Sequence, residues 1–177
     1  FTGTPIRPAL YAGDRGRARA FTGFSGGKPV LLVMGGSLGA QKLNELLRAA
    51  LPELVKKFDV IHLCGRGKLE PACARDGYAQ YEYIDRELPD LFALAAVVLS
   101  RAGANAVFEL LALHKPSVLV PLSKSSTRGD QLLNAAYFAP VVYQAFFGKP
   151  AAAVAGHGAE AHGHGVAHGH HDHGEAP

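Results

Sequence analysis

The stretch PVLLVMGGSLGAQKLNE (29–45) decides the fold class of this chain. It opens with PVLLVM (29–34), a continuous apolar run rich in branched side chains, which is typical of a strand buried on both faces. The glycine-rich MGGSLGA (34–40) then turns the chain, and residues 40–58 space their leucines three and four positions apart, as a helix does. Pro52 lies inside that helix and is expected to kink or divide it.

The same alternation of strand and helix continues along the chain. Further strands are expected at 59–65, 80–84, 96–103 and 116–122, and further helices at 67–77, 86–95, 104–114 and 128–139. This order predicts an α/β fold with a Rossmann-like, doubly wound parallel sheet. Ligands of such sheets bind beyond the carboxyl ends of the strands. The positions of interest are therefore 35–39, 84–85, 101–105 and 121–130.

Composition divides the chain into two parts. Residues 1–140 are expected to form one folded domain, and residues 141–177 an unrelated tail of mainly Ala, Gly and His. Because the tail has almost no branched apolar residues, we expect it to be disordered beyond about residue 150. The opening FTGTPIRPAL (1–10) has the composition of a linker and begins without methionine, so we expect a fragment whose front part is missing.

Charge and cysteine content exclude several classes of function. The net charge is only +3, and the basic residues Arg15, Arg17, Arg19 and Lys28 lack interleaved aromatics, so they predict a solvated face and no nucleic-acid partner. Cys64 and Cys73 form neither a disulfide framework nor a CxxC metal pair. The longest apolar run, LFALAAVVL (91–99), is too short to cross a bilayer and is typical of a buried core.

Three segments at strand ends carry candidate ligand-binding groups. Each of these segments also has a purely structural interpretation. The turn at 34–40 offers free amides, a helix dipole and the Ser37 hydroxyl to a phosphate, or is a tight packing turn. The second expected strand ends in HLCGRG without the carboxylate that a dinucleotide-binding oxidoreductase places there, which disfavours that class.

The segment SRAGANAVFELLAL (100–113) is more informative. Its helix start would present the amides of Ala104, Asn105 and Ala106 to a second anionic group. Glu109, one turn deeper, is either an acceptor for the two hydroxyls of a ribose or an ordinary exposed helix glutamate, and spacing alone leaves the two level.

In PLSKSSTRGDQLLNA (121–135) the polar side chains Asp130, Gln131 and Asn134 follow a strand-end loop. They would read sugar hydroxyls. Alternatively, Asp130 starts a helix and Asn134 is solvated surface.

Five ordered motifs together resemble a known family. TGTPIR, VMGGSLGAQKLNE, YIDRELPDLFALA, SRAGANAVFELLAL and RGDQLLNAAYF, spanning roughly residues 2 to 139, are similar to the C-terminal, donor-binding half of the bacterial UDP-N-acetylglucosamine–N-acetylmuramyl-(pentapeptide) pyrophosphoryl-undecaprenol N-acetylglucosamine transferases, of glycosyltransferase family 28. The resemblance implies half of a two-domain GT-B fold and inverting transfer of N-acetylglucosamine from UDP-N-acetylglucosamine to the lipid-linked muramyl pentapeptide. It places the reaction in peptidoglycan synthesis, at the cytoplasmic face of the bacterial inner membrane.

The resemblance also implies the role of each candidate residue. Arg7 faces the donor pyrophosphate, Ser37 contacts the donor, and the backbone of Ile84 reads the uracil. Glu109 holds the ribose hydroxyls, Gln131 reads the sugar hydroxyls, and Asp130 lies beside it. The helix start under the phosphates corresponds to Ala104, Asn105, Ala106, Val107 and Phe108.

The developing charge on UDP would be met by two helix starts and Arg7, without a metal or other cofactor. We find no catalytic residue in this chain, since His62 and His114 are expected to have structural roles. In the family, the acceptor and membrane surfaces belong to the N-terminal domain. The chain alone is therefore expected to be inactive, with its lipid acceptor and peripheral membrane association supplied by that domain.

Beyond Phe138 the chain departs from the family pattern. Seven of the nine histidines lie in the tail, where adventitious Zn²⁺, Ni²⁺ or Cu²⁺ binding is the expectation. The histidines concerned are His162, His164, His168, His170, His171 and His173. The alternative functions are a His-rich metal-binding protein or another NDP-sugar-binding Rossmann-like domain.

Overall fold

The computed structural model describes residues 6–36, 40–121, 130–131 and 133–136. Its centre is a five-stranded sheet in the order β3-β2-β1-β4-β5, and all four pairs of neighbouring strands are parallel. The strands are β1 (Val30–Met34), β2 (Asp59–Leu63), β3 (Tyr78–Tyr81), β4 (Val97–Arg101) and β5 (Ser117–Val120). The predicted doubly wound parallel sheet is confirmed.

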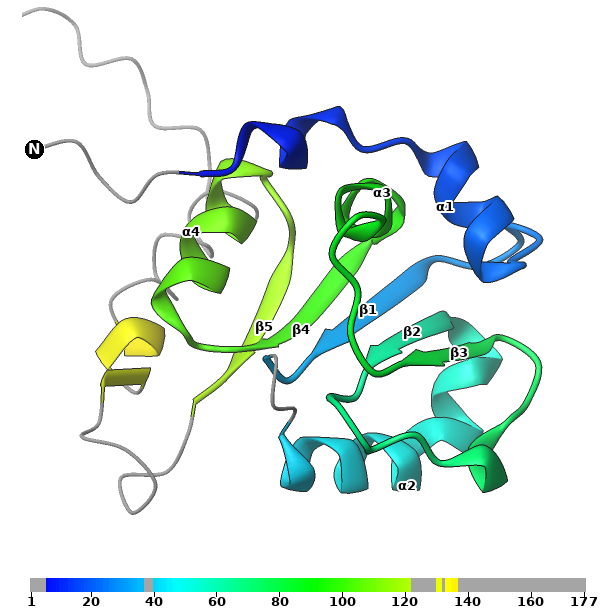
Figure 1. Cartoon of the computed structure of the whole chain (residues 1–177). Coiled ribbons are helices and arrows are strands. Elements are labelled where there is room, and N and C mark those ends of the chain that lie inside the picture. The colour runs from blue at the N-terminus through cyan, green and yellow to red at the C-terminus, as the bar shows by residue number, and fades with distance from the viewer. Residues whose placement is uncertain (1–5, 37–39, 122–129, 132, 137–177) are drawn as a thin grey trace, which may run out of the picture.

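Helices cover both faces of the sheet (Figure 1). On one face, Leu31 and Val33 of β1 pack against leucines of α2 (Gln41–Lys57). The other face, with Leu32 of β1, packs against α3 (Leu88–Leu94), and Leu110 of α4 (Ala104–Ala112) joins the same core. Because alternate residues of β1 enter different cores, the whole strand is apolar, which is the pattern that PVLLVM showed.

Two predicted elements differ from the structure. The helix expected at 67–77 is absent. Within it, only η2 (Pro71–Cys73), a short 3₁₀ turn, is helical. Gly67 and Gly77 both adopt positive φ angles, of 66° and 74°, which interrupt a right-handed helix on either side of this turn. The helix around Pro52 is instead one continuous element, α2, so the expected division does not occur.

The N-terminal segment is folded, and the expectation of a linker there is wrong for its described part. Residues 8–12 form η1 (Pro8–Ala12), and α1 follows at Arg15–Thr22. Leu10 and Ala18 are 3% and 0% exposed and belong to the α3-side core. Asp14 caps the start of α1, where its carboxylate accepts from the Arg17 amide, and Gly23, with a φ of 74°, caps its end.

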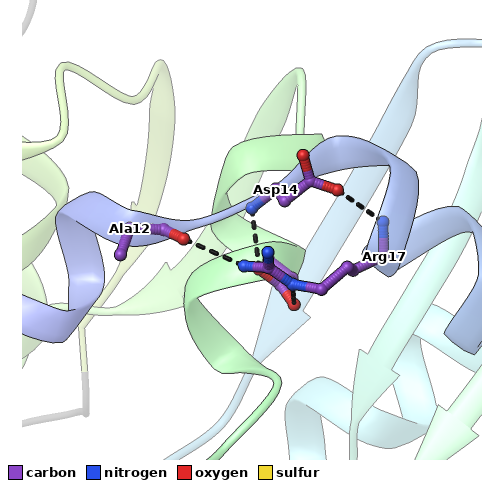
Figure 2. Close-up of polar contacts among 4 residues, drawn as sticks. Ala12, Asp14 and Arg17 are labelled. Atoms are coloured by element: carbon purple, nitrogen blue, oxygen red, sulfur yellow. Dashed lines mark hydrogen bonds and ion pairs between the residues drawn. The ribbon is translucent and has the colours of Figure 1, made fainter.

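An ion pair fastens this segment to α3. Asp90 accepts hydrogen bonds from Nε and Nη2 of Arg17 at 2.9 and 2.7 Å and from the Asp14 amide at 2.7 Å. Figure 2 shows Arg17 also reaching the Ala12 carbonyl, so one side chain joins η1, α1 and α3. The hydrogen bonds from Arg17 lower the pKa of Asp90. Arg17 is nevertheless 63% exposed, and Arg15, Arg19 and Lys28 are exposed too, so these residues form the predicted solvated face.

Residues 130–131 and 133–136 are helical, in agreement with the last predicted helix. The boundary expected at residue 140 and the whole histidine tail lie outside the described residues. No helix in the described part of the chain is both long and apolar enough to cross a membrane.

Candidate functional site

The direction of winding reverses at β1. The chain moves outward from β1 to β2 and β3, and then returns to place β4 on the other side of β1. Met34 and Ser100 are partners in the register of β1 and β4, so the glycine turn after β1 and the turn after β4 begin side by side. Open parallel sheets bind ligands at this switch point, outside the carboxyl ends of the strands.

A charged cluster joins three distant segments near this edge. Arg7, immediately before η1, donates from Nη1 to Oδ1 of Asp85 at 3.1 Å. Its Nη2 lies 3.4 Å from Oε1 of Glu109, on α4. The side chains of Arg7 and Asp85 are 50% and 65% exposed, whereas that of Glu109 is 17% exposed. The structure thus brings together two residues that the sequence singled out, Arg7 and Glu109, and adds Asp85.

Glu109 is not the exposed surface glutamate of the plain alternative, because its carboxylate is mostly buried and ion-paired. Its role toward a ribose stays a prediction. Asp85 was not singled out as a ligand residue, although it directly follows Ile84 in the same predicted strand-end segment. Its position next to Ile84 was the sequence signal by which Asp85 could have been found.

The first turn of α4 presents backbone donors. Gly103 precedes the helix in an extended conformation, and among the described residues no side chain caps it. The amides of Ala104, Asn105 and Ala106 have no intrahelical partner, as at every helix start. Ala104 and Asn105 are exposed and Ala106 is half-buried, so this end of the helix is open to an anion.

Val107 and Phe108 differ from the three residues before them. The Val107 side chain is 1% exposed, and its amide donates to the Gly103 carbonyl at 3.0 Å. Val107 therefore anchors the helix start and offers no donor of its own to a ligand in this arrangement. Phe108 is partly buried on the next position of the helix.

Hydrogen bonds between β2 and β3 continue past the end of β2. The amides of Cys64 and Gly65 donate to the carbonyls of Tyr81 and Glu82, which aligns the two strand ends. Ile84 follows these pairs and packs its side chain against the α3-side core, which fixes its backbone at the edge of the sheet. Tyr83 is 52% exposed, with the guanidinium of Arg66 5.9 Å from its ring centre.

The helix that carries Asp130 and Gln131 is tied to the turn after β4. Asn134 donates from Nδ2 to the Ala102 carbonyl at 3.0 Å. The interpretation of Asn134 as solvated surface is therefore wrong. Asp130 is exposed and Gln131 is half-buried, and their contacts with a sugar stay predictions.

His62 is fully buried and cannot contact a substrate. It is 0% exposed, with Nδ1 2.9 Å from the Tyr78 hydroxyl and Nε2 3.0 Å from Oδ1 of Asn44. Because Nδ2 of Asn44 donates to the Cys64 carbonyl, its Oδ1 accepts, which assigns the ring proton to Nε2. Burial and the charge of Arg48 lower the pKa of His62 to about 4, so the ring is neutral at pH 7.

His114 has a local structural role. It follows α4 and has a φ of 50°. The amide of His114 donates to the carbonyl of Leu111, and the amide of Lys115 donates to the carbonyl of Leu110. This pair of bonds is a Schellman motif, which ends the helix.

Ser37 and the tail histidines named above lie outside the described residues. Within the described ranges, no three His, Cys, Asp or Glu side chains come together as metal ligands. A hollow of about 430 Å³ lies between the η1–α1 segment and α3, but its lining residues come from neither the end of β1 nor the end of β4. The candidate binding groups therefore lie at the carboxyl ends of the strands and not in this hollow.

Comparisons with known proteins identify the family of the chain. Residues 30–148 match the family described as Glycosyltransferase family 28 C-terminal domain. The chain is 54% identical over 139 residues to "UDP-N-acetylglucosamine--N-acetylmuramyl-(pentapeptide) pyrophosphoryl-undecaprenol N-acetylglucosamine transferase 2" of Bacillus anthracis, covering 78% of this chain and 40% of the relative. It is 56% identical over 138 residues to the transferase of the same name, without the numeral, of Lachnoclostridium phytofermentans, covering 77% of this chain and 39% of the relative.

The crystal structure of Acinetobacter baumannii MurG superimposes with a TM-score of 0.60 at 26% identity, over 80% of this chain and 43% of that one. The chain thus spans about 40% of the length of the curated relatives it matches. The family match covers most of this chain and all of β1 to β5. The chain belongs to the glycosyltransferase family 28 C-terminal domain family.

Proposed function

We propose that this chain binds UDP-N-acetylglucosamine as the donor for inverting transfer of N-acetylglucosamine to undecaprenyl-pyrophosphoryl-muramyl pentapeptide. The observation that carries the proposal is the convergence of Arg7, immediately before η1, and Glu109, on α4, beside the open start of α4. Relatives whose names state this reaction are 54% and 56% identical to the chain.

The donor would lie across the switch point, with its ribose and pyrophosphate against α4 and Arg7. Glu109 would accept from both ribose hydroxyls, because a carboxylate has room for two donors. Arg7 and the amides of Ala104, Asn105 and Ala106 would face the pyrophosphate, where charge accumulates as UDP leaves. Phe108 and Val107 would support this turn from within the helix.

The remaining parts of the donor would meet the neighbouring loops. The backbone of Ile84 would read the edge of the uracil, with its position set by the pairing of Cys64 and Gly65 with the β3 end. Ser37 would add a hydroxyl near the phosphates. Gln131, with Asp130 beside it, would read the hydroxyls of N-acetylglucosamine.

Nη2 of Arg7 lies 3.4 Å from Oε1 of Glu109. A ribose diol that binds Glu109 would displace this contact, and the freed guanidinium would then be available for the pyrophosphate. Asp85, 3.1 Å from Arg7, would keep the side chain nearby during the exchange.

Proton transfer from the acceptor hydroxyl needs a general base. His62, the one histidine buried in the described core, is neutral but 0% exposed, and His114 serves a helix end. We therefore place the base, the lipid acceptor site and peripheral attachment to the cytoplasmic face of the bacterial membrane in the remainder of a longer enzyme. This chain alone would bind donor without transferring its sugar.

Calorimetric titration of the full chain with UDP-N-acetylglucosamine tests the proposal, with ADP-glucose and NADH as competitors of the other classes. Saturable binding of UDP-N-acetylglucosamine, unchanged by EDTA, is expected. EDTA would remove any metal from the histidine tail, so loss of binding in its presence would favour the metal-binding alternative. Equal binding of NADH would favour a general dinucleotide fold.

A further inference from the structure

Arg7 reaches the charged cluster from a segment that is fastened to α3. Asp90, on α3, accepts two hydrogen bonds from the Arg17 guanidinium and one from the Asp14 amide, all between 2.7 and 2.9 Å. Nη2 of Arg17 also donates at 3.0 Å to the carbonyl of Ala12, the last residue of η1 (Figure 2). Because η1 begins directly after Arg7, Asp90 holds one end of a short helix whose other end carries Arg7.

The backbone of this segment also lies directly on the start of α3. Gly13 follows η1, and a Cβ at this position would collide with the carbonyl oxygen of Pro89 and lie 3.0 Å from the Cβ of Ala93. Packing is nevertheless incomplete, because a hollow of about 430 Å³ lies between the segment and α3. The place of the segment therefore depends on buried Leu10, on the close approach at Gly13 and on the hydrogen bonds to Asp90.

The start of α3 also carries the second partner of Arg7. Asp85 lies just before α3, where its carbonyl accepts from the Leu88 amide at 3.3 Å and its carboxylate accepts from Arg7 at 3.1 Å. α3 thus sets the backbone of Arg7 through η1 and its guanidinium through Asp85. Since Arg7 is half exposed and reaches from here to Glu109 on α4, a shift of η1 along α3 would move the guanidinium away from the α4 start.

We propose that Asp90 is a positioning residue for anion binding, which through Arg17 and η1 holds Arg7 where its guanidinium can reach the pyrophosphate of the donor. The inference rests on the proposed function. Asp90 does not touch the ligand in this scheme, because its carboxylate is engaged by three donors of the N-terminal segment. Its effect should therefore appear with ligands that carry a pyrophosphate and not with the nucleoside.

Asp90→Asn in the full chain tests this inference by titration with UDP and with uridine. The affinity for UDP should fall by roughly three- to tenfold, because a displaced Arg7 loses part or all of its charge-assisted bond to the pyrophosphate. The affinity for uridine should not fall, and retained uridine binding shows at the same time that the site is folded. Asp76→Asn is the matched control, because Asp76 is exposed, and it should leave both affinities unchanged.

Gly13→Ala tests the same positioning without changing any charge. Its Cβ would meet backbone atoms of Pro89, which cannot turn aside as a flexible side chain does, so the segment must move off α3. The same selective loss of UDP affinity is expected. Gly27→Ala is the matched glycine control, because a Cβ at Gly27 would have no neighbouring atom within 4 Å.

A double-mutant cycle with Arg7→Ala identifies the residue through which Asp90 acts. In the Arg7→Ala background, Asp90→Asn should have little further effect on the affinity for UDP, because the group that it positions is already gone. Equal losses for UDP and uridine, no loss for UDP, or effects of the two substitutions that simply add would each overturn the positioning role and leave the proposed function standing. A wild-type chain that binds neither UDP nor UDP-N-acetylglucosamine would overturn the proposed function and this inference with it.

Discussion

Nη2 of Arg7 lies 3.4 Å from Oε1 of Glu109, so a residue of the N-terminal segment and a residue of α4 share one charged contact at the edge of the sheet. The two side chains differ in their exposure and in their other partners. Arg7 is half exposed and has a second partner in Asp85, whereas the carboxylate of Glu109 is 17% exposed. Partly exposed ion pairs of this kind contribute little to folding, so the contact is better suited to exchange than to stability.

Arg7→Ala should separate the binding of phosphate from the binding of nucleoside. The affinity for UDP should fall by roughly tenfold, since a charge-assisted hydrogen bond to the pyrophosphate is lost. The affinity for uridine should stay the same or rise, because Glu109 loses a competing partner. Titrations with UDP and uridine measure both, and Arg75→Ala, on an exposed turn, controls for net charge. Parallel losses for the two ligands would show that Arg7 only shapes the fold.

His62 should make folding stability depend on pH. Its pKa is lowered from 6.5 to about 4 in the folded chain, so between these values the unfolded chain binds the extra proton. The contribution to stability is complete above pH 6.5 and is lost as the pH falls toward 4, in total about 3 kcal/mol. Denaturant unfolding from pH 7.5 to 4 should therefore show a flatter profile for His62→Gln than for the wild type, while the exposed His114→Gln keeps the wild-type slope. Identical slopes in all three chains would contradict the buried neutral ring.

His114→Gly should stabilise the chain. His114 has a φ of 50°, in the left-handed region that glycine adopts without steric cost. Relief of the left-handed strain, about 1–2 kcal/mol, exceeds the about 0.4–1 kcal/mol that the added freedom of glycine in the unfolded chain costs. The expected net gain is up to about 1 kcal/mol in the free energy of unfolding, measured by denaturant titration. His114→Ala should give no such gain, because alanine retains the Cβ. A glycine variant no more stable than the alanine variant would contradict the Schellman geometry at this helix end.

Asp90→Asn should loosen the N-terminal segment without unfolding the sheet. Asp90 receives two hydrogen bonds from Arg17 and one from the Asp14 amide, so losing its charge weakens the attachment of η1 and α1 to α3. Amide hydrogen exchange should accelerate in Arg15–Thr22 and stay unchanged in β1. Asp76→Asn, on an exposed turn, is the matched control. Unchanged exchange in α1 would show that apolar packing of Leu10 and Ala18 alone holds the segment.

The strands and the longer helices could be predicted because their signals are local. Val30 to Val33 are apolar throughout since both faces of β1 are covered, and the leucines of α2 keep a helical spacing. α1 was missed because RGRARAFT buries only Ala18, which leaves no apolar stripe to recognise. Asp14 and Gly23 could nevertheless be recognised from the sequence as its N-terminal and C-terminal caps.

Candidate residues at the strand edge could be named from the sequence, but the contacts between them could not, and their roles toward a ligand stay predictions. Glycine turns, the helix start at Ala104 and the resemblance to family 28 pointed to the strand edge. The pairing of Arg7 with Asp85 and the bond from Asn134 to Ala102 join segments far apart in the sequence. Contacts of that kind follow from tertiary packing, which no local pattern encodes.

The most direct test of UDP-sugar binding at this edge compares Glu109→Ala with the wild type, using UDP and its 2′-deoxyribose analogue. The wild type should bind the analogue roughly tenfold more weakly than UDP, because Glu109 loses one of its two hydroxyl donors. Glu109→Ala should bind UDP at least roughly tenfold more weakly than the wild type, should no longer distinguish the two ligands, and should melt at nearly the wild-type temperature. Unchanged affinity for UDP together with a lower melting temperature would contradict the account, since Glu109 would then be no more than the structural partner of Arg7.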